Sequence, residues 1–395
     1  MLGFATYAAL LPQLRDAWAL SNVEAGVIGG MFFAGYVAAV SYSTALTDRV
    51  DGRRIYLVGS LVAAAASVAF GLFADGLLAA ACFQALLGAG IAGTYMPGLR
   101  LLSDRVSGAA QSRYIAFYTS FFGIGTAFSF ALAGAIAPAA GWRAAFVVSA
   151  AGPLLAGLLV FFCIRKREAK GSCARTAFAF RTLFPLAAWR KVLSHRGAAG
   201  YTLGYTAHCL ELFGSRSWIV AFLAFSAGLQ AGTNFPWPAP TIAAAANMLA
   251  VPASIVGNEI ALRIGRQRWI VTAMAASGSC GVLLALSASW HWGIVLALLV
   301  VYSMLVMAES ATLTAGLVGA APPELRGAAM GLYSLAGFGG GMLGPMVFGG
   351  ALDAAGGAGR PLSWALGYAA IGAGCLAAPL VARAFGRSVE SSRHP

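Results

Sequence analysis

Long apolar segments dominate this chain and decide what it can fold into. Eleven of them contain twenty residues or more, the length that an α-helix needs to cross a hydrocarbon core of about 30 Å. Hydrophobic residues make up 59% of the chain and charged residues only 10%, against about 25% charged residues in a soluble domain. We therefore expect an all-α protein that crosses a membrane many times. The apolar segments are 1–12, 23–47, 55–74, 77–101, 111–138, 143–163, 197–226, 239–262, 269–288, 292–318, 327–350 and 363–384.

A basic interval separates these segments into two sets of six. It is rich in Lys and Arg, and it is the longest polar stretch of the chain. We predict an N-terminal six-helix half at 1–163, a basic cytoplasmic central loop at 164–196, a C-terminal six-helix half at 197–386 and a short cytoplasmic tail at 387–395.

The basic residues also predict the orientation in the membrane. With both termini in the cytoplasm, 22 of the 26 Lys and Arg residues fall on the cytoplasmic side, three fall outside and one lies within a span. Cytoplasmic loops of membrane proteins carry such an excess. We expect a multi-pass protein of the cell (inner) membrane with cytoplasmic termini. The same distribution explains the net charge of +13: the basic residues set the orientation in the membrane and face anionic lipid headgroups. We therefore predict no nucleic-acid partner.

The first apolar segment is too short to cross a bilayer. As a helix, its 12 residues would extend about 18 Å, against a core of about 30 Å. We expect a truncated first helix, because the start codon was assigned too late or because residues upstream were lost.

The stretch "TALTDRVDGRRIYL", residues 44–57, lies between the second and third segments. It resembles the signature loop of the major facilitator superfamily, G-x-L-x-D-R-x-G-R-R, with Thr44 in place of the usual glycine and Asp51 as an extra residue. The resemblance implies a twelve-helix transporter and a charge clamp that holds the cytoplasmic side shut. The alternative is plain anchoring by positive charge. The matching residues are Leu46, Asp48, Arg49, Gly52, Arg53 and Arg54.

The second half repeats this loop in "GNEIALRIGRQRWI", residues 257–270. Gly265 and Arg266 correspond to the glycine and the first following arginine of the first loop. Similar offsets between corresponding loops of the two halves indicate an internal repeat of six spans. Two such halves around a site near the membrane midplane are the architecture expected of the superfamily.

The seventh segment carries three ionisable residues, in "GYTAHCLELFGSRSWIVAFLAF". A charge at the bilayer centre costs about 2.5 kcal/mol or more, so His208, Glu211 and Arg216 must face a watery cavity or a partner. Three interpretations remain open. The stripe lines the transport cavity together with Tyr205, with Glu211 as proton carrier tuned by His208; or Glu211 forms a structural pair with His208 or Arg216; or Arg216 reaches the outer headgroups.

Other spans contribute further candidates for substrate binding or coupling. Glu309 is a carboxylate within the tenth segment, and such residues are functional candidates by default. Asn247 lies in the eighth segment, and Tyr36 and Tyr95 lie in the second and fourth. A single tyrosine of this kind more often packs or anchors a helix than contacts a ligand.

These features favour a secondary active transporter that moves a small solute by alternating access, as a proton-coupled symporter or antiporter. His208 and Arg216 favour a small organic anion. The alternatives are an exporter of amphiphilic drugs and a transporter-like receptor or scaffold. The four histidines lack the spacing of a metal-dependent enzyme, and six scattered cysteines predict neither a disulfide framework nor a zinc site. We expect no enzymatic activity, no cofactor and no metal, and a monomer in the lipid bilayer.

Overall fold

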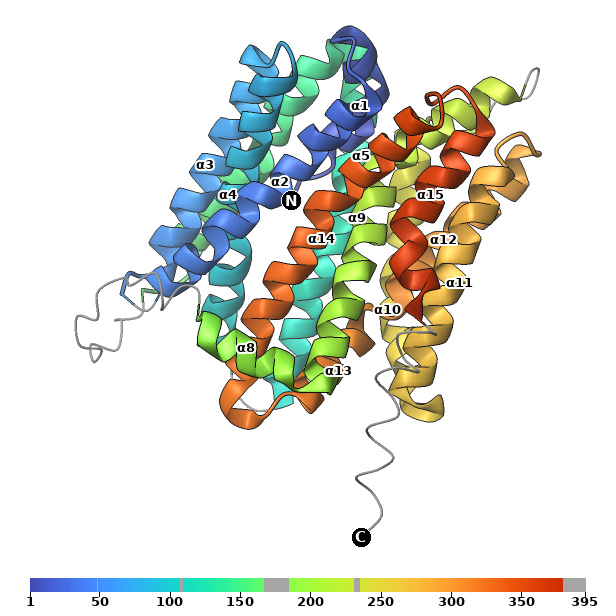
Figure 1. Ribbon diagram of the computed structural model, residues 1–395. Helices are drawn as coiled ribbons and strands as arrows, with labels where there is room; N and C mark the ends of the chain where they lie inside the picture. The colour runs from blue at the N-terminus through green and yellow to red at the C-terminus, as the bar shows by residue number, and fades with distance from the viewer. Residues whose placement is uncertain (48, 107–108, 167–184, 231–234, 379–395) are drawn as a thin grey trace. The chain divides into compact units, whose positions relative to one another are not determined.

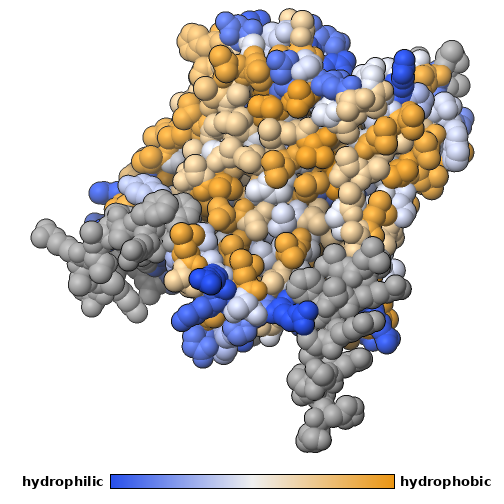
Figure 2. All heavy atoms as spheres, in the orientation of Figure 1, coloured by the Kyte–Doolittle hydropathy of each residue, from blue (hydrophilic) through white to orange (hydrophobic). Residues whose placement is uncertain are grey.

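The structure, a computed structural model, describes residues 1–47, 49–106, 109–166, 185–230 and 235–378 (Figure 1). Within these ranges it contains helices and no strand, as the all-α prediction requires. Nine helical stretches of the described chain are long and apolar enough to cross a membrane, and α15 is a shorter apolar helix. Figure 2 shows hydrophobic residues over the middle of the helices and hydrophilic residues gathered toward the helix ends.

The helices of the first half follow one another with short connections. They are α1 (Thr6–Ala17), α2 (Asn22–Leu46), α3 (Gly52–Phe73), α4 (Leu77–Ser103), α5 (Ala109–Ser149) and α6 (Ala151–Cys163). The fifth and sixth predicted segments meet inside α5, where Gly141 has a φ of 84° and the helix is kinked. Helix α1 continues past Pro12, so it ends five residues later than the apolar segment predicted at 1–12.

The second half begins with a short helix inside the interval predicted as a loop. The helices are α8 (Leu186–Ser194), α9 (Arg196–Leu229), α10 (Ala239–Ile264), α11 (Arg266–Leu286), α12 (Trp292–Ala308), α13 (Ser310–Ala320), η1 (Pro323–Leu325), α14 (Arg326–Ala354) and α15 (Pro361–Leu376). Helix α8 buries Trp189 and Val192, which explains why this part of the interval is ordered as a helix. The tail predicted at 387–395 and the charged stretch 167–184 lie outside the described residues.

The chain forms two compact units that differ slightly from the predicted halves. Unit 1 comprises Met1–Leu20, Val27–Phe184 and Pro238–Met248; unit 2 comprises Ser21–Gly26, Pro185–Trp237 and Leu249–Pro395. Helix α2 therefore begins in unit 2 and continues in unit 1, whereas α10 begins in unit 1 and continues in unit 2.

Specific contacts explain why these first turns are grouped with the other half of the sequence. In unit 2, Asp353 at the end of α14 caps the start of α2. Its Oδ1 accepts from the backbone N–H of Asn22 at 3.2 Å and from the Asn22 amide at 2.7 Å, and its Oδ2 accepts from the N–H of Val23 at 2.8 Å. A carboxylate at a helix N-terminus satisfies unpaired N–H groups and opposes the helix dipole. In unit 1, Pro240 of α10 packs against Gly134 of α5.

Close approach of helix backbones holds unit 1 together. A Cβ atom at Gly88 of α4 would collide with the carbonyl oxygen of Phe32 in α2, and one at Gly35 of α2 would collide with the carbonyl oxygen of Ala85. Small residues permit this contact between membrane helices, where packing rather than hydrophobicity drives association. The glycines of α2 and α4 are therefore required by the helix spacing.

The change Gly88→Ala tests this requirement. We expect it to lower the free energy of unfolding by about 1–3 kcal/mol, because the added methyl group must displace backbone. Thermal unfolding in detergent measures the loss. The control is Gly76→Ala, where an added Cβ has nothing within 4 Å. Equal stability of the two variants would contradict the packing described here.

Candidate functional site

Helix α9 buries all three of its central ionisable side chains inside unit 2. The exposed fraction is 1% for His208, 1% for Glu211 and 9% for Arg216. Each residue faces a different partner, which we describe in turn. Helix α9 lies beside α14 along its length (Figure 1).

His208 pairs with Glu309. The Nδ1 atom of His208 lies 3.0 Å from Oε1 of Glu309, and Glu309 is fully buried. Its other oxygen, Oε2, has no hydrogen-bond partner among the described residues. One carboxylate oxygen is thus fixed by the imidazole, and the other is an unused acceptor in a dry environment.

The helix of the tenth span has a one-residue irregularity at Glu309. Helix α12 ends at Ala308 and α13 begins at Ser310, with Glu309 between them at φ −95° and ψ −10°. The indole N–H of Trp269 in α11 donates to the carbonyl oxygen of Ala308 at 3.1 Å. The carbonyl oxygen of Glu309 still accepts from the N–H of Leu313 at 2.8 Å, and Trp292–Ala320 forms one membrane-spanning stretch. The carboxylate therefore lies at an irregular point of a membrane-spanning helix.

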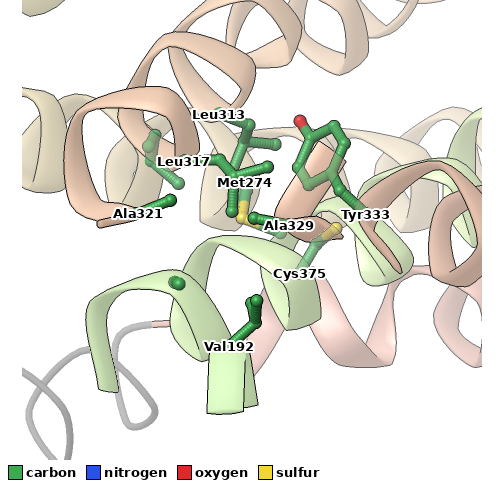
Figure 3. Packing of buried hydrophobic residues seen from close by; sticks show 10 residues of the cluster. Val192, Met274, Leu313, Leu317, Ala321, Ala329, Tyr333 and Cys375 are labelled. Carbon is green, nitrogen blue, oxygen red and sulfur yellow. The ribbon is translucent and has the colours of Figure 1, made fainter. Parts of the chain in front are cut away.

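Stacked aromatic rings lead away from this pair. The ring of Tyr205 stacks on that of Tyr333 at 3.8 Å between centroids, and it lies 5.7 Å from the ring of His208. The Tyr333 hydroxyl lies 3.1 Å from the hydroxyl of Thr314 in α13. Tyr333 in turn packs within an apolar cluster that α8, α11, α13, α14 and α15 contribute to (Figure 3). This packing fixes Tyr205 beside the His208–Glu309 pair.

Arg216 has no acidic partner among the described residues. Its guanidinium donates to the thioether sulfur of Met307 at 3.6 Å, and no described carboxylate lies within ion-pair distance of it. A thioether is a weak acceptor, so it does little to offset the cost of burying a cation. The guanidinium of Arg216 is a buried positive charge whose compensation the described chain does not provide.

Glu211 faces away from the other two charges. The hydroxyl of Ser277 in α11 lies 2.9 Å from its Oε2. Its Oε1 points toward Gly372 of α15, where an added Cβ would lie 3.8 Å away. The second of the three interpretations, a pair between Glu211 and His208 or Arg216, is therefore not what the structure contains. Glu211 and Arg216, five positions apart, lie about 140° apart around the helix. Glu211 and His208 share a face, but they contact different helices, α11 for Glu211 and the junction of α12 and α13 for His208.

The remaining candidates belong to unit 1. Tyr36 is buried in α2. The ring of Tyr95 packs against those of Tyr118 and Phe122 at 5.5 and 5.9 Å, and the Tyr118 hydroxyl donates to the carbonyl of Tyr95 at 2.8 Å. The amide of Asn247 donates to the carbonyl of Ala243 in its own helix at 2.8 Å. The structure thus brings together five of the eight candidates in unit 2 and places these three in unit 1.

The signature loop is built around Asp51. Asp51 caps α3 by accepting from the N–H of Arg53 at 3.1 Å, and it forms an ion pair with the Arg53 guanidinium at 2.7 Å. Arg53 also donates to the carbonyl of Ile164 at the end of α6, at 2.8 Å. Asp48, which the sequence motif favours for this role, lies outside the described residues. Arg53 therefore links α3 to α6, and Asp51, which the motif treats as an insertion, holds the Arg53 guanidinium in place.

The corresponding loop of unit 2 depends on a glycine. Gly265 has a φ of 95°, which disfavours other residues, and it directly precedes α11. The guanidinium of Arg266 lies near Gly319, in the last turn of α13. A cation near a helix C-terminus is favourable.

Sequence reasoning missed three residues that contact the candidates or the residue next to one: Asp51, Ser277 and Trp269. Asp51 had a signal, because an aspartate directly before an apolar helix is a typical N-cap. Ser277 and Trp269 had none, because a serine or tryptophan in a membrane span is common and only the tertiary packing brings these two to Glu211 and Ala308.

The sequence model of the Major Facilitator Superfamily matches residues 1–345. The chain belongs to the Major Facilitator Superfamily. A match at 26% identity over 159 residues links it to the niacin transporter NiaP of Acinetobacter baylyi, covering 40% of this chain and 35% of that protein. The chain therefore matches about a third of the length of that relative.

Solved structures share the whole fold. A bacterial homolog of the human lysosomal transporter Spinster, in an inward-facing and unoccupied conformation, has a TM-score of 0.72 at 16% identity over 98% of this chain and 93% of its own. The nucleoside transporter NupG, solved as a point mutant, has a TM-score of 0.71 at 15% identity over 98% and 97%. These likenesses confirm the predicted twelve-helix transporter fold. The protein is a multi-pass membrane protein of a superfamily of transporters.

Protonation of Asp51 provides a test of the loop. Burial raises the pKa of Asp51. The hydrogen bonds from the side chain and backbone of Arg53, together with its positive charge, lower that pKa by more, so the pKa lies below its ordinary value of 3.8. The stabilisation is therefore complete above that ordinary value and is lost as the pH falls through the lower pKa of the folded protein.

Asp51→Ala should lower the free energy of unfolding by about 1–3 kcal/mol at neutral pH, because both the cap and the ion pair are lost. The difference between variant and parent should shrink as the pH falls below about 3.9. Thermal unfolding across a pH series measures it. The control is Asp75→Ala, an exposed aspartate at the opposite end of α3. A difference that stays constant down to low pH would rule out an ionised Asp51 as its source.

Proposed function

We propose that this protein moves a small organic anion across the membrane together with protons, by alternating access. The observation that carries the proposal is the buried guanidinium of Arg216, for which the described residues offer only a thioether sulfur as acceptor. Burying an uncompensated charge costs several kcal/mol, and a binding site is where such a cost is recovered. A carboxylate or similar anion would complete the site by charge-assisted hydrogen bonds.

The relative supports the same substrate class. It is a niacin transporter, and niacin is a small aromatic carboxylic acid. The stacked rings of Tyr205 and Tyr333 offer a flat surface of the kind that would suit an aromatic or planar anion.

The His208–Glu309 pair supports proton coupling. At 3.0 Å, the imidazole Nδ1 donates to an ionised carboxylate, or accepts from a protonated one, without a change in distance. One proton can therefore be added to the pair while the contact is kept, and the free Oε2 of Glu309 can receive it. Adding a positive charge in a medium of low dielectric changes the local energy strongly, which can bias the protein between conformations that bind the anion differently.

The proposal includes a location. The distribution of Lys and Arg favours the cell (inner) membrane with both termini in the cytoplasm. We propose a monomer as the functional unit.

Replacing Glu309 tests the coupling role. In proteoliposomes, Glu309→Gln should reduce anion-driven proton flux at least tenfold, because the amide does not titrate. Exchange of labelled anion for unlabelled anion across the same membrane should persist, because exchange needs no net proton movement. The control is Glu259→Gln, the same change at an exposed carboxylate. Unchanged proton flux in Glu309→Gln would remove Glu309 from the coupling mechanism.

Replacing Arg216 tests the substrate class. Arg216→Met should raise the KM for the anion at least tenfold, whereas Arg216→Lys should raise it less, because the charge is kept and the planar guanidinium is lost. The control is Arg268→Met at an exposed position. The Tm of Arg216→Met should be no lower than the Tm of the parent, because the substitution removes a buried charge that is costly to the folded state.

Three results would contradict the anion assignment. Transport of lipophilic cations by the parent protein would favour an exporter of amphiphilic drugs. Binding of a solute without any transport would favour a receptor or scaffold. An unchanged KM in Arg216→Met would place the anion elsewhere.

A further inference from the structure

Glu211 is a buried carboxyl group that the proposed transport site does not use. It is 1% exposed, and the two basic side chains of its own helix are directed elsewhere: His208 contacts Glu309 and Arg216 contacts Met307. The contacts around Glu211 indicate whether this carboxyl group is protonated or ionised.

Hydrogen counting at Ser277 gives an answer. The Ser277 oxygen lies 2.9 Å from Oε2 of Glu211 and 3.0 Å from the carbonyl oxygen of Met274. A hydroxyl group has one hydrogen to donate, and a carbonyl oxygen can only accept. If Ser277 donates to Met274, its contact with Glu211 needs a hydrogen on the carboxyl group. A protonated Glu211 thus satisfies both contacts, in the order Glu211 to Ser277 to Met274.

The opposite assignment is much less favourable. If Ser277 donates to an ionised Glu211, its one hydrogen must be shared with the Met274 carbonyl, and a shared hydrogen makes two weaker bonds. The ionised carboxylate would then be buried among uncharged groups, namely the Ser277 hydroxyl, the Cys375 thiol and the Tyr302 hydroxyl, and burying a carboxylate without a cation beside it is costly. The neutral acid avoids that cost.

The groups that face Glu211 are neutral or acidic. Its electrostatic neighbours are Cys280 of α11, Tyr302 of α12, Glu309, and Tyr368 and Cys375 of α15. The hydroxyl of Tyr368 is buried and has no hydrogen-bond partner among the described residues. Beside the carboxyl group, an added Cβ at Gly372 would lie 3.2 Å from the Cα of Gly278. Helices α15 and α11 are therefore too close beside Glu211 to admit a hydrated cation.

We infer that Glu211 is a second proton-binding site, inside unit 2 and distinct from the His208–Glu309 pair, and that it holds its proton as a carboxylic acid joining α9 to α11. The bound proton is a fixed part of this helix contact and is not exchanged with each transport cycle. The inference concerns the proton of Glu211 alone, and it stands whether or not Glu309 carries a transported proton.

Infrared spectroscopy of the full-length protein detects the acid directly. At neutral pH, the difference spectrum between the parent and Glu211→Gln should contain the carbonyl band of a protonated carboxylic acid. In the parent, that band should keep its intensity when a transported anion or a pH gradient is applied. The band should remain in Glu309→Gln, which assigns it to Glu211 and not to Glu309. The inference would be overturned if the difference spectrum lacked this band, or if it showed that Glu211→Gln had lost bands of an ionised carboxylate instead.

Thermal unfolding tests the hydrogen bond itself. The amide of Glu211→Gln donates to Ser277 as the acid does, so its Tm should stay close to that of the parent. Glu211→Met has similar size and no donor, and its Tm should fall by several degrees. Equal loss in both variants would exclude the donor role. A rise in Tm of the parent with sodium chloride but not with matched choline chloride, absent in Glu211→Gln, would identify a cation site instead and overturn the inference.

Discussion

Buried charge is the constraint on which the rest of unit 2 depends. A helix that carries a histidine, a glutamate and an arginine through a membrane must find each of them a partner or a ligand, and α9 does so in three directions. His208 contacts Glu309 at the junction of α12 and α13, Glu211 contacts Ser277 of α11, and Arg216 contacts Met307. The contacts of α9 with α11, α12 and α13 bring these partners into reach.

The three partners also differ in what they allow. A carboxylate paired with an imidazole can gain or lose a proton while the contact persists, which suits coupling. A buried carboxyl group without a cation beside it is most stable as the neutral acid, which suits a fixed helix contact. A guanidinium without a carboxylate partner among the described residues is suited to bind an anion that arrives from outside the protein. In the proposed mechanism, one helix thus carries three roles that its sequence places within nine positions.

The sequence predicted the fold well because membrane spans depend on properties that single segments carry. Length and hydropathy located the helices, and the loop from Thr44 to Leu57 identified the superfamily. The sequence also marked His208, Glu211, Arg216 and Glu309 as candidates, since charges are rare in spans. It could not pair them, because Glu309 is 101 positions from His208 and Ser277 is 66 positions from Glu211. The irregularity at Glu309 had no proline or glycine to indicate it, and Asp51 was overlooked because the motif aligned Asp48 in its place.

The most direct test of the central claim uses the unmodified protein in proteoliposomes, with an imposed pH gradient and a panel of labelled small carboxylates beside lipophilic cations. The account predicts that the pH gradient drives accumulation of at least one carboxylate, and that a protonophore abolishes this accumulation. Movement of the carboxylate that is indifferent to the pH gradient, or accumulation of the cations alone, would contradict proton-coupled anion transport.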